Sequence, residues 1–273
     1  MKLTNKTLTW MVAGMVSIAL VVGANAQTTK ERTGKVVRIK GAARYSMGNK
    51  TWQPLKVGTV LKAGSVVQTA ADSYADIVLN EEATAETVSM PRPATSPTAL
   101  IPSAGGGSGG NKVSEHDVVR VQSDSVLAID KVSATDTGVD RVTETELDLR
   151  SGSIFFSVKK QAAASRFEVK LPNGVAGIRG TMGIIYADGR IVCGAGSVVS
   201  AFTDSTGKVT TKVVPGGSQF NNSNGQTSAI GGPLSGTIQT LAQETSYGVS
   251  RGTGAEFINV QNLGREHVSE TQP

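Results

Sequence analysis

The sequence predicts an all-β fold, a roll, sandwich or solenoid of short strands, with one short helix near the C-terminus. Apolar and polar residues alternate over many runs that are only as long as a strand. Glycine or an Asn-Gly pair separates these runs, and 32 of the 273 residues are glycine. No helical segment lies between successive runs, which argues against a doubly wound α/β sheet.

The first residues are typical of a cleavable signal peptide, residues 1–26. Lys2 and Lys6 precede an apolar run that ends at Val22, and Ala24-Asn25-Ala26 then offers small residues to a signal peptidase. The run is shorter than the roughly 20 residues of a membrane-spanning helix, and no later run is long enough. We therefore expect a mature chain that begins near residue 27 and is periplasmic or secreted.

The expected strands follow in order. Residues 34–40 and 42–46 alternate on either side of Gly41, which predicts a hairpin. Short apolar pairs between glycines at 58–69, and an alternating run at 74–79, predict the next strands. The remaining expected strands are residues 118–122, 126–132, 146–150, 153–159, 166–171, 182–186, 191–202 and 209–214.

Two segments interrupt this pattern. Residues 91–115 hold four prolines and a Gly/Ser run, so we expect a flexible insertion. The insertion is no phosphate-binding loop, because Asn111 separates Gly110 from Lys112. Leu234, Ile238 and Leu241 lie at helical spacing, and the helix they predict is expected to cover the end or edge of the β core. Residues 249–273 are expected to form a tail.

Charge and cysteine content exclude several classes of protein. The formal charge is +5, and the signal peptide carries two of the lysines and no acid. With so small an excess and 4% aromatic residues, a nucleic-acid groove is not expected. Cys193 is the only cysteine, so no intrachain disulfide can form. We expect it to be buried as a small apolar residue, the alternative being an intermolecular disulfide.

Several stretches between Gly34 and about Gly189 resemble the FecR domain. They are GKVVRIKGAARY, LKVGTVLKAGSVVQTAADSYADIVL, ELDLRSGSIFFSVKK and RFEVKLPNGVAGIRGTMGIIYADG. The positions that match the family pattern are Gly58, Leu61, Gly64, Val67, Thr69, Leu149, Gly152, Val158, Phe167, Val169, Pro172, Gly174, Arg179, Gly180 and Thr181. The resemblance implies a β domain over residues 34–189, split by the insertion 91–115 and followed by a β-rich extension with a helix at 190–248.

Most of these motif positions have an architectural explanation. Gly58, Gly64, Gly152 and Gly180 stand between strand-like runs, where a turn or bulge favours positive φ. Asn173-Gly174 is typical of a tight turn, and Phe167 is expected in the core, while Pro172 and Thr181 complete the same stretch. For Arg179 we expect an internal partner, the alternative being a cation presented on a tight bend.

The resemblance also has a limit. FecR regulators of iron uptake carry a cytoplasmic segment that holds a sigma factor, followed by a membrane span, whereas this sequence opens with the predicted signal peptide. The resemblance therefore implies a fold and extracytoplasmic interaction, and it does not imply iron regulation.

The sequence favours binding over catalysis. His116 and His267 have no credible partner for catalysis, and no cluster has the spacing of a metal site, so no catalytic residue, metal or cofactor is expected. Glu144 and Glu146 are expected in surface salt bridges. The leading hypothesis is a protein-interaction or signalling module of the cell envelope. A carbohydrate-binding or adhesive protein that uses Trp52, Tyr45 and Tyr74, and an envelope enzyme with a carboxylate site, are the alternatives.

Overall fold

The computed structural model describes residues 28–48, 51–82, 116–204 and 206–252. The predicted signal peptide, the predicted insertion 91–115 and His267 lie outside the described residues. In the part of the chain that the structure describes, no helix has the length and apolar character needed to cross a membrane.

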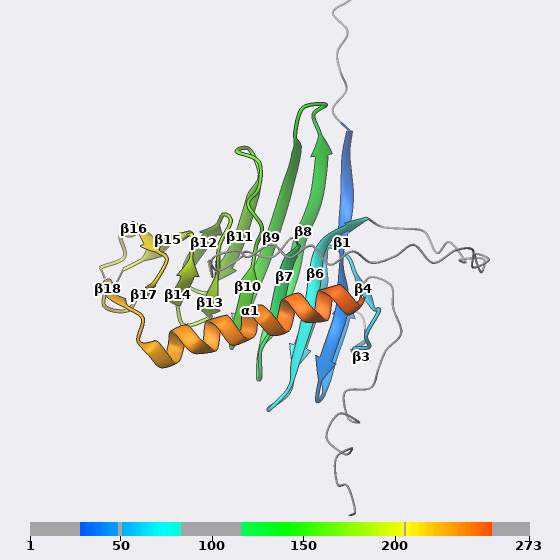
Figure 1. Ribbon diagram of the computed structural model, residues 1–273, viewed down its shortest axis with the longest axis horizontal. Coiled ribbons are helices and arrows are strands. Elements are labelled where there is room, and N and C mark those ends of the chain that lie inside the picture. The colour runs from blue at the N-terminus through cyan, green and yellow to red at the C-terminus, as the bar shows by residue number, and fades with distance from the viewer. Residues whose placement is uncertain (1–27, 49–50, 83–115, 205, 253–273) are drawn as a thin grey trace, which may run out of the picture.

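The described residues form strands and one long helix, which confirms the all-β prediction (Figure 1). The elements are β1 (Thr28–Lys40), β2 (Ala43–Met47), β3 (Gln53–Pro54), β4 (Val60–Leu61), β5 (Ser65–Thr69), β6 (Tyr74–Glu82), β7 (Asp117–Val121), β8 (Val126–Asp136), β9 (Arg141–Ser151), β10 (Ser153–Ser157), β11 (Arg166–Leu171), β12 (Gly174–Ile178), β13 (Met182–Tyr186), β14 (Arg190–Ala195), β15 (Ser197–Thr203), β16 (Val209–Pro215), β17 (Ser218–Asn221), β18 (Gln226–Ala229) and α1 (Gly232–Gly252).

The strands form two facing sheets. Sheet A has the order β3-β2-β5-β8-β9-β11-β12-β15-β16, and only its β9–β11 pair is parallel. Sheet B has the order β4-β1-β6-β7-β10-β13-β14-β17-β18 and is antiparallel throughout. The long strand β1 joins the two, because Thr28–Glu31 pair with β8 in sheet A and Arg32–Lys40 pair with β6 in sheet B.

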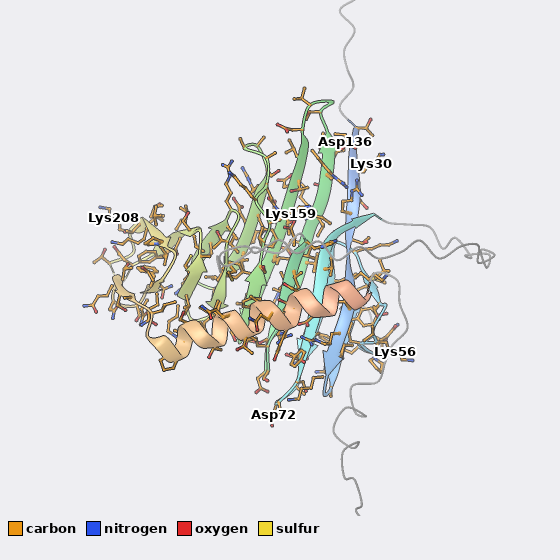
Figure 2. All side chains as sticks on the ribbon, viewed as in Figure 1. Lys30, Lys56, Asp72, Asp136, Lys159 and Lys208 are labelled. Carbon is orange, nitrogen blue, oxygen red and sulfur yellow. The ribbon has the colours of Figure 1, made fainter. Side chains whose placement is uncertain are left out.

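From β8 onward the chain alternates regularly between the sheets. The hairpins β8–β9, β11–β12 and β15–β16 lie in sheet A, while β10 and the hairpins β13–β14 and β17–β18 lie in sheet B. Each hairpin extends its sheet by two strands, so the sandwich grows in one direction (Figure 1). Lys208, just before β16, and Lys56, just after β3, accordingly lie at opposite ends of the molecule (Figure 2).

The main core fills the space between the sheets, with alternate residues of each strand pointing inward. Its largest fully buried side chains include Phe156, Phe167, Phe220, Leu61, Ile77, Leu127, Ile129, Leu147, Leu149 and Ile154. Phe155 points the other way from Phe156 and belongs to a second apolar cluster on the outer face of sheet B. Strands β7 and β10 are therefore buried on both faces, which explains their nearly continuous apolar sequence.

Helix α1 covers the outer face of sheet B. Leu234, Ile238 and Leu241 pack on Phe155 and Ile184 in this second cluster, and Ile238 is 1% exposed. The sequence correctly predicted these three residues as the helix's apolar stripe. The expectation that the helix would cover an end or edge was wrong, since it crosses the face from β14 toward β1 (Figure 1).

Two expectations about strands also require correction. The predicted 34–46 hairpin does not form, because β1 and β2 belong to different sheets. Residues 191–202 form two strands, since the chain turns at Gly196, whose φ is +79°, and passes from sheet B to sheet A. The Gly/Asn/Ser-rich segment after β16 contains β17 and β18, because cross-strand pairing overrides the weak strand propensity of those residues.

Candidate functional site

The motif glycines shape the turns of the sandwich. Gly58, Gly64, Gly152 and Gly180 have φ values of +88°, +85°, +76° and +59°, as the sequence predicted. Gly174 has no positive φ and serves a different purpose: a Cβ there would lie 2.3 Å from the carbonyl oxygen of Ala201 on β15. It is therefore the close approach of β12 and β15 that requires glycine at this position.

The Arg179-Gly180-Thr181 bend carries the chain from sheet A to sheet B. Thr181 is fully buried, and its Oγ1 lies 2.9 Å from the carbonyl oxygens of both Arg179 and Ser197. Its backbone exchanges hydrogen bonds of 2.9 and 3.0 Å with Val158. The bend thus binds the end of β10 and the start of β15 together, which is an architectural role for Gly180 and Thr181.

The remaining motif side chains, Phe167, Pro172 and Arg179, lie in the core or on the surface. Phe167 is 1% exposed in the core, and Pro172 is exposed at the β11–β12 turn. The expectation of an internal partner for Arg179 is wrong. Its side chain is exposed, and among the described residues none forms an ion pair or side-chain hydrogen bond with it. The bend points this side chain outward, so the cation is presented to solvent.

The centre of sheet A's outer face is charged. Lys131 forms an ion pair of 2.5 Å with Glu144, and Lys170 lies 3.0 Å from both Asp130 and Glu146. The predicted surface salt bridges of Glu144 and Glu146 are confirmed. Both carboxylates are neutralised on an open face, so this arrangement lacks the paired, poised acids that glycoside hydrolysis requires.

The end of sheet A beyond β12 has a different character. The outward residues of β15 and β16 are apolar or hydroxylated, and Val199, Val209 and Val213 are 43%, 68% and 56% exposed. Val199 and Val213 are directly opposite each other in the β15–β16 register. Strand β16 pairs with β15 alone among the described strands, so its other edge is open. We call β16 with these three valines the β16 edge.

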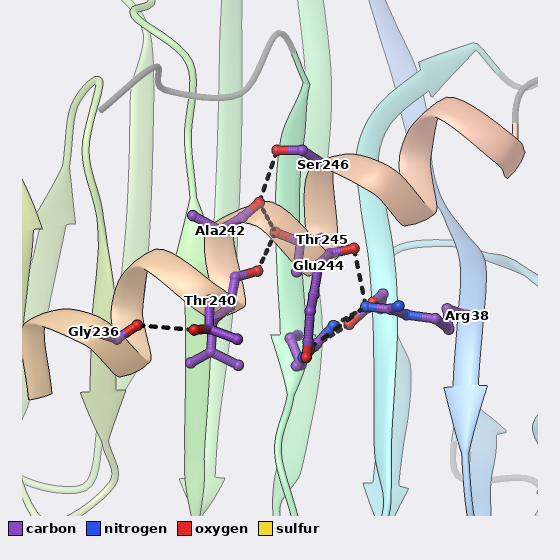
Figure 3. Close-up of polar contacts among 10 residues, drawn as sticks. Arg38, Gly236, Thr240, Ala242, Glu244, Thr245 and Ser246 are labelled. Atoms are coloured by element: carbon purple, nitrogen blue, oxygen red, sulfur yellow. Dashed lines mark hydrogen bonds and ion pairs between the residues drawn. The ribbon is translucent and has the colours of Figure 1, made fainter. Parts of the chain in front are cut away.

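A buried charge cluster joins α1 to sheet B. Arg120 on β7 is 2% exposed, and its Nε and Nη2 donate to the two carboxylate oxygens of Asp76 on β6 at 2.6 and 3.0 Å. Its Nη1 donates to Glu244 of α1 at 2.5 Å. Arg38 on β1 donates to Asp76 at 2.9 Å and to the backbone oxygen of Glu244 at 3.0 Å (Figure 3).

This cluster was not anticipated from the sequence, although a signal for it exists. Asp76 and Arg120 each have apolar residues immediately before and after them in their strands, and charged residues are rarely buried unless paired. Its Asp76 side chain is fully buried and saturated by two arginines, with Tyr74 beneath the Arg120 guanidinium at 4.1 Å. Arg38, Asp76 and Arg120 therefore hold α1 on sheet B through Glu244, and we call these three strand residues the latch.

No group in the described residues is arranged for nucleophilic or metal chemistry. Cys193 is fully buried, as predicted, and burial raises the pKa of its thiol to about 11, so it is a poor nucleophile. No group of three or more His, Cys, Asp or Glu side chains in the described part of the chain could hold a metal ion.

The three aromatic residues proposed for sugar binding are separated. Trp52 lies beside Arg44 at the β2–β3 edge of sheet A, whereas Tyr45 packs on the core and donates its hydroxyl to Gln53 at 3.1 Å. Tyr74 lies in the charge cluster of sheet B instead. The three rings therefore do not form one sugar-binding platform.

A comparison with known sequences gives a family match for part of the chain. Residues 112–199 match the family model described as "FecR protein". This segment is similar to the FecR domain. The match runs through β7 to β14 and into β15, so it includes Gly152, Phe167, Pro172, Gly174, Arg179, Gly180 and Thr181. Gly58 and Gly64 precede the matched residues, and strand β16 follows them. No curated protein matches the chain.

Solved structures give a more distant likeness. Two crystal structures of a "putative anti-sigma factor" from Parabacteroides distasonis ATCC 8503 align with the chain at 15% and 16% identity. Each alignment covers 44% of this chain and 53% of the other, with a TM-score of 0.30. The alignment thus spans about half the length of those structures.

Proposed function

We propose that this FecR-domain protein is a non-catalytic interaction module of the cell envelope, which binds an extended segment of a partner protein at the β16 edge. The open edge of β16 is the observation that carries the proposal. A strand of seven residues with a free row of backbone donors and acceptors can accept a further strand.

The side chains around this edge favour a protein segment. Val199, Val209 and Val213 offer apolar contacts to every second residue of an added strand. Lys208 and Lys212 flank the valines and are exposed, so a segment with an acidic residue beside its apolar positions would fit best. Backbone pairing would provide affinity, and these side chains would provide specificity.

The envelope location in this proposal is supported by the predicted signal peptide and by the FecR match. Both the location and the partner are parts of the proposal. The absence of a poised nucleophile or metal cluster among the described residues is the reason to propose binding as the activity.

Photocrosslinking in intact cells tests the proposal. A photoreactive amino acid replaces Val213 in one variant and Val139, a 93% exposed residue of the β8–β9 turn, in a second. We expect one protein to crosslink strongly at position 213 and not at position 139. The Val213→Lys substitution, in a chain with the photoreactive residue at position 209, should reduce that crosslink at least tenfold, whereas Val139→Lys should leave it unchanged.

Equal crosslinking at the two positions would show that the β16 edge has no selectivity and would contradict the proposal. Recovery of no protein from position 213 would contradict it as well. Both lysine variants are on exposed positions, so circular dichroism of each is expected to match the parent and to separate lost binding from lost fold.

A further inference from the structure

An open groove lies beside Trp52 at the opposite edge of sheet A from β16. It has a volume of about 500 Å³ and is formed by β2, β3 and the end of β5. Ala43, Ala70 and Pro54 form apolar walls, while Arg44, Trp52, Gln53 and Gln68 supply the remaining groups. Strands β3 and β16 lie at opposite ends of the molecule, so this groove is separate from the β16 edge (Figure 1).

The groove has a fixed aromatic platform. Trp52 is 40% exposed, and the guanidinium carbon of Arg44 lies 4.7 Å from the centroid of its ring. The Nε of Arg44 donates to Oε1 of Gln68 at 2.9 Å, which fixes the guanidinium relative to β5. An exposed indole held in this way offers a rigid apolar surface at little cost in side-chain entropy.

The side chains on the Arg44 face of the groove offer more hydrogen-bond donors than acceptors. Oε1 of Gln68 already accepts a hydrogen bond from Arg44, and the NH₂ group of Gln68 supplies two donors. The terminal guanidinium nitrogens of Arg44 are donors as well. A matching ligand must therefore be rich in acceptors.

The groove also carries an uncompensated positive charge. No Asp or Glu lines it, and within the described residues no carboxylate forms an ion pair with Arg44. A guanidinium beside an aromatic ring, with donors around it, suits a ligand that combines a flat C–H face with a carboxylate.

We propose that this groove binds an acidic glycan built from uronic acid residues. The C–H face of one pyranose ring stacks on Trp52, its carboxylate pairs with Arg44, and ring or hydroxyl oxygens accept from Gln68. A proline-rich peptide fits less well, because such peptides dock between several aromatic side chains and the groove has one. The proposal is independent of the protein partner at β16.

Fluorescence gives a direct test, since the sequence holds only two tryptophans, Trp10 and Trp52. In a Trp10→Phe background, all tryptophan emission comes from Trp52 in the groove, whether or not the predicted signal peptide is removed. The probes are oligosaccharides of galacturonate, of alginate and of hyaluronan, each with its methyl ester as the uncharged match. We expect at least one uronate to change the Trp52 emission saturably and its uncharged match to bind about tenfold more weakly.

Variants then assign the contacts, with calorimetry as the readout. Arg44→Gln and Trp52→Ala should each weaken the uronate about tenfold or more, whereas Lys62→Gln, an exposed change elsewhere on the protein, should not. Equal affinity for the esterified probe, no response to any of the three uronates, or saturable binding of a proline-rich peptide in their place would overturn the proposal. Each of these outcomes leaves crosslinking at Val213 unaffected.

Discussion

Gly152 and Gly58 adopt the same left-handed backbone region but have different surroundings. A Cβ on Gly152 would lie 2.2 Å from Ser125 Oγ, 2.6 Å from its Cα and 2.7 Å from the carbonyl oxygen of Asp124. At Gly58 no atom lies within 4 Å of the same position. Gly152 is thus required both by its positive φ and by the lack of room for a Cβ atom. Gly58 is required by its positive φ alone.

This difference predicts the effects of two alanine substitutions. Gly58→Ala should lower the free energy of unfolding by about 1–2 kcal/mol, the cost of a left-handed non-glycine residue. Gly152→Ala should cost about 2–5 kcal/mol, because overpacking against the β7–β8 turn adds to that strain. Urea denaturation measures both values. Equal losses would show that the contact with Ser125 and Asp124 is unimportant.

Asp117 is a buried carboxylate at the start of β7. It is 1% exposed and accepts hydrogen bonds from Asn80 at 2.7 Å, Gln161 at 3.0 Å and the backbone of Lys159 at 3.1 Å. Burial raises the pKa of Asp117 above its ordinary value of 3.8, and the hydrogen bonds only partly offset this effect. The folded state therefore holds this proton more tightly than the unfolded state.

A raised carboxyl pKa gives a definite dependence of stability on pH. The contribution of Asp117 is fully present below pH 3.8 and is lost as pH rises through the folded-state pKa. Asp117→Asn removes that titration, so the wild type should lose stability relative to this variant as pH rises from 3 to 7. Urea midpoints across the range measure the difference. The exposed control Asp136→Asn should keep the wild-type profile; a difference between wild type and Asp117→Asn that stays constant with pH would contradict the assignment.

At the scale of elements, α1 is held by two kinds of contact. Ile238 and its neighbours pack on Phe155 and Ile184, while Glu244 meets the latch of Arg38, Asp76 and Arg120 on the strands. The Asp76–Arg120 pair is buried, whereas the Glu244 side chain is 44% exposed. Most of the electrostatic energy therefore resides in the sheet, and the helix contributes a partly solvated partner.

Substitutions of the buried pair should therefore cost more unfolding free energy than substitutions of the partly exposed Glu244. Arg120→Met leaves Asp76 buried with Arg38 as its remaining arginine, so we expect a loss of about 3–5 kcal/mol in unfolding free energy. Glu244→Gln removes one partly exposed charge and should cost less than about 1 kcal/mol. Chemical denaturation ranks the two variants. A larger loss for Glu244→Gln would mean that the helix contact, and not the buried pair, holds the cluster together.

At the scale of the whole molecule, the alternation of hairpins gives the sandwich two distinct ends. Sheet A ends at β3 on one side and at β16 on the other, because each successive hairpin adds strands in the same direction. The Trp52 groove and the β16 edge consequently lie far apart along the long axis (Figure 1). A protein partner and a glycan could thus be held at the same time without competing for one surface.

The segment that matches the FecR model is only part of the folded sandwich. It begins at residue 112 and ends within β15, yet β1, β5 and β6 pair with strands inside the match. The matched segment therefore shares its sheets and its core with the chain on both sides. Strand β16 and the Trp52 groove both lie outside the match, so they are features of this chain in addition to the family pattern.

Local pattern in the sequence determined the all-β class, most of the strands from β5 to β16, the positive-φ glycines and the apolar stripe of α1. These features depend on neighbouring residues: alternation sets which face is buried, and a missing Cβ permits a left-handed turn. The same reasoning placed Phe167 and Cys193 in the core and Glu144 and Glu146 in surface ion pairs.

Only the tertiary structure decided which sheet each strand joins and what lies at the edges. The exposure of Arg179, the crossing of α1 over a sheet face, the burial of Asp76 against Arg120 and the open edge of β16 all depend on residues far apart in sequence. Strand pairing is set by the combined burial and hydrogen bonding of the whole sandwich. A local run of residues carries the periodicity of a strand but not the identity of its neighbours.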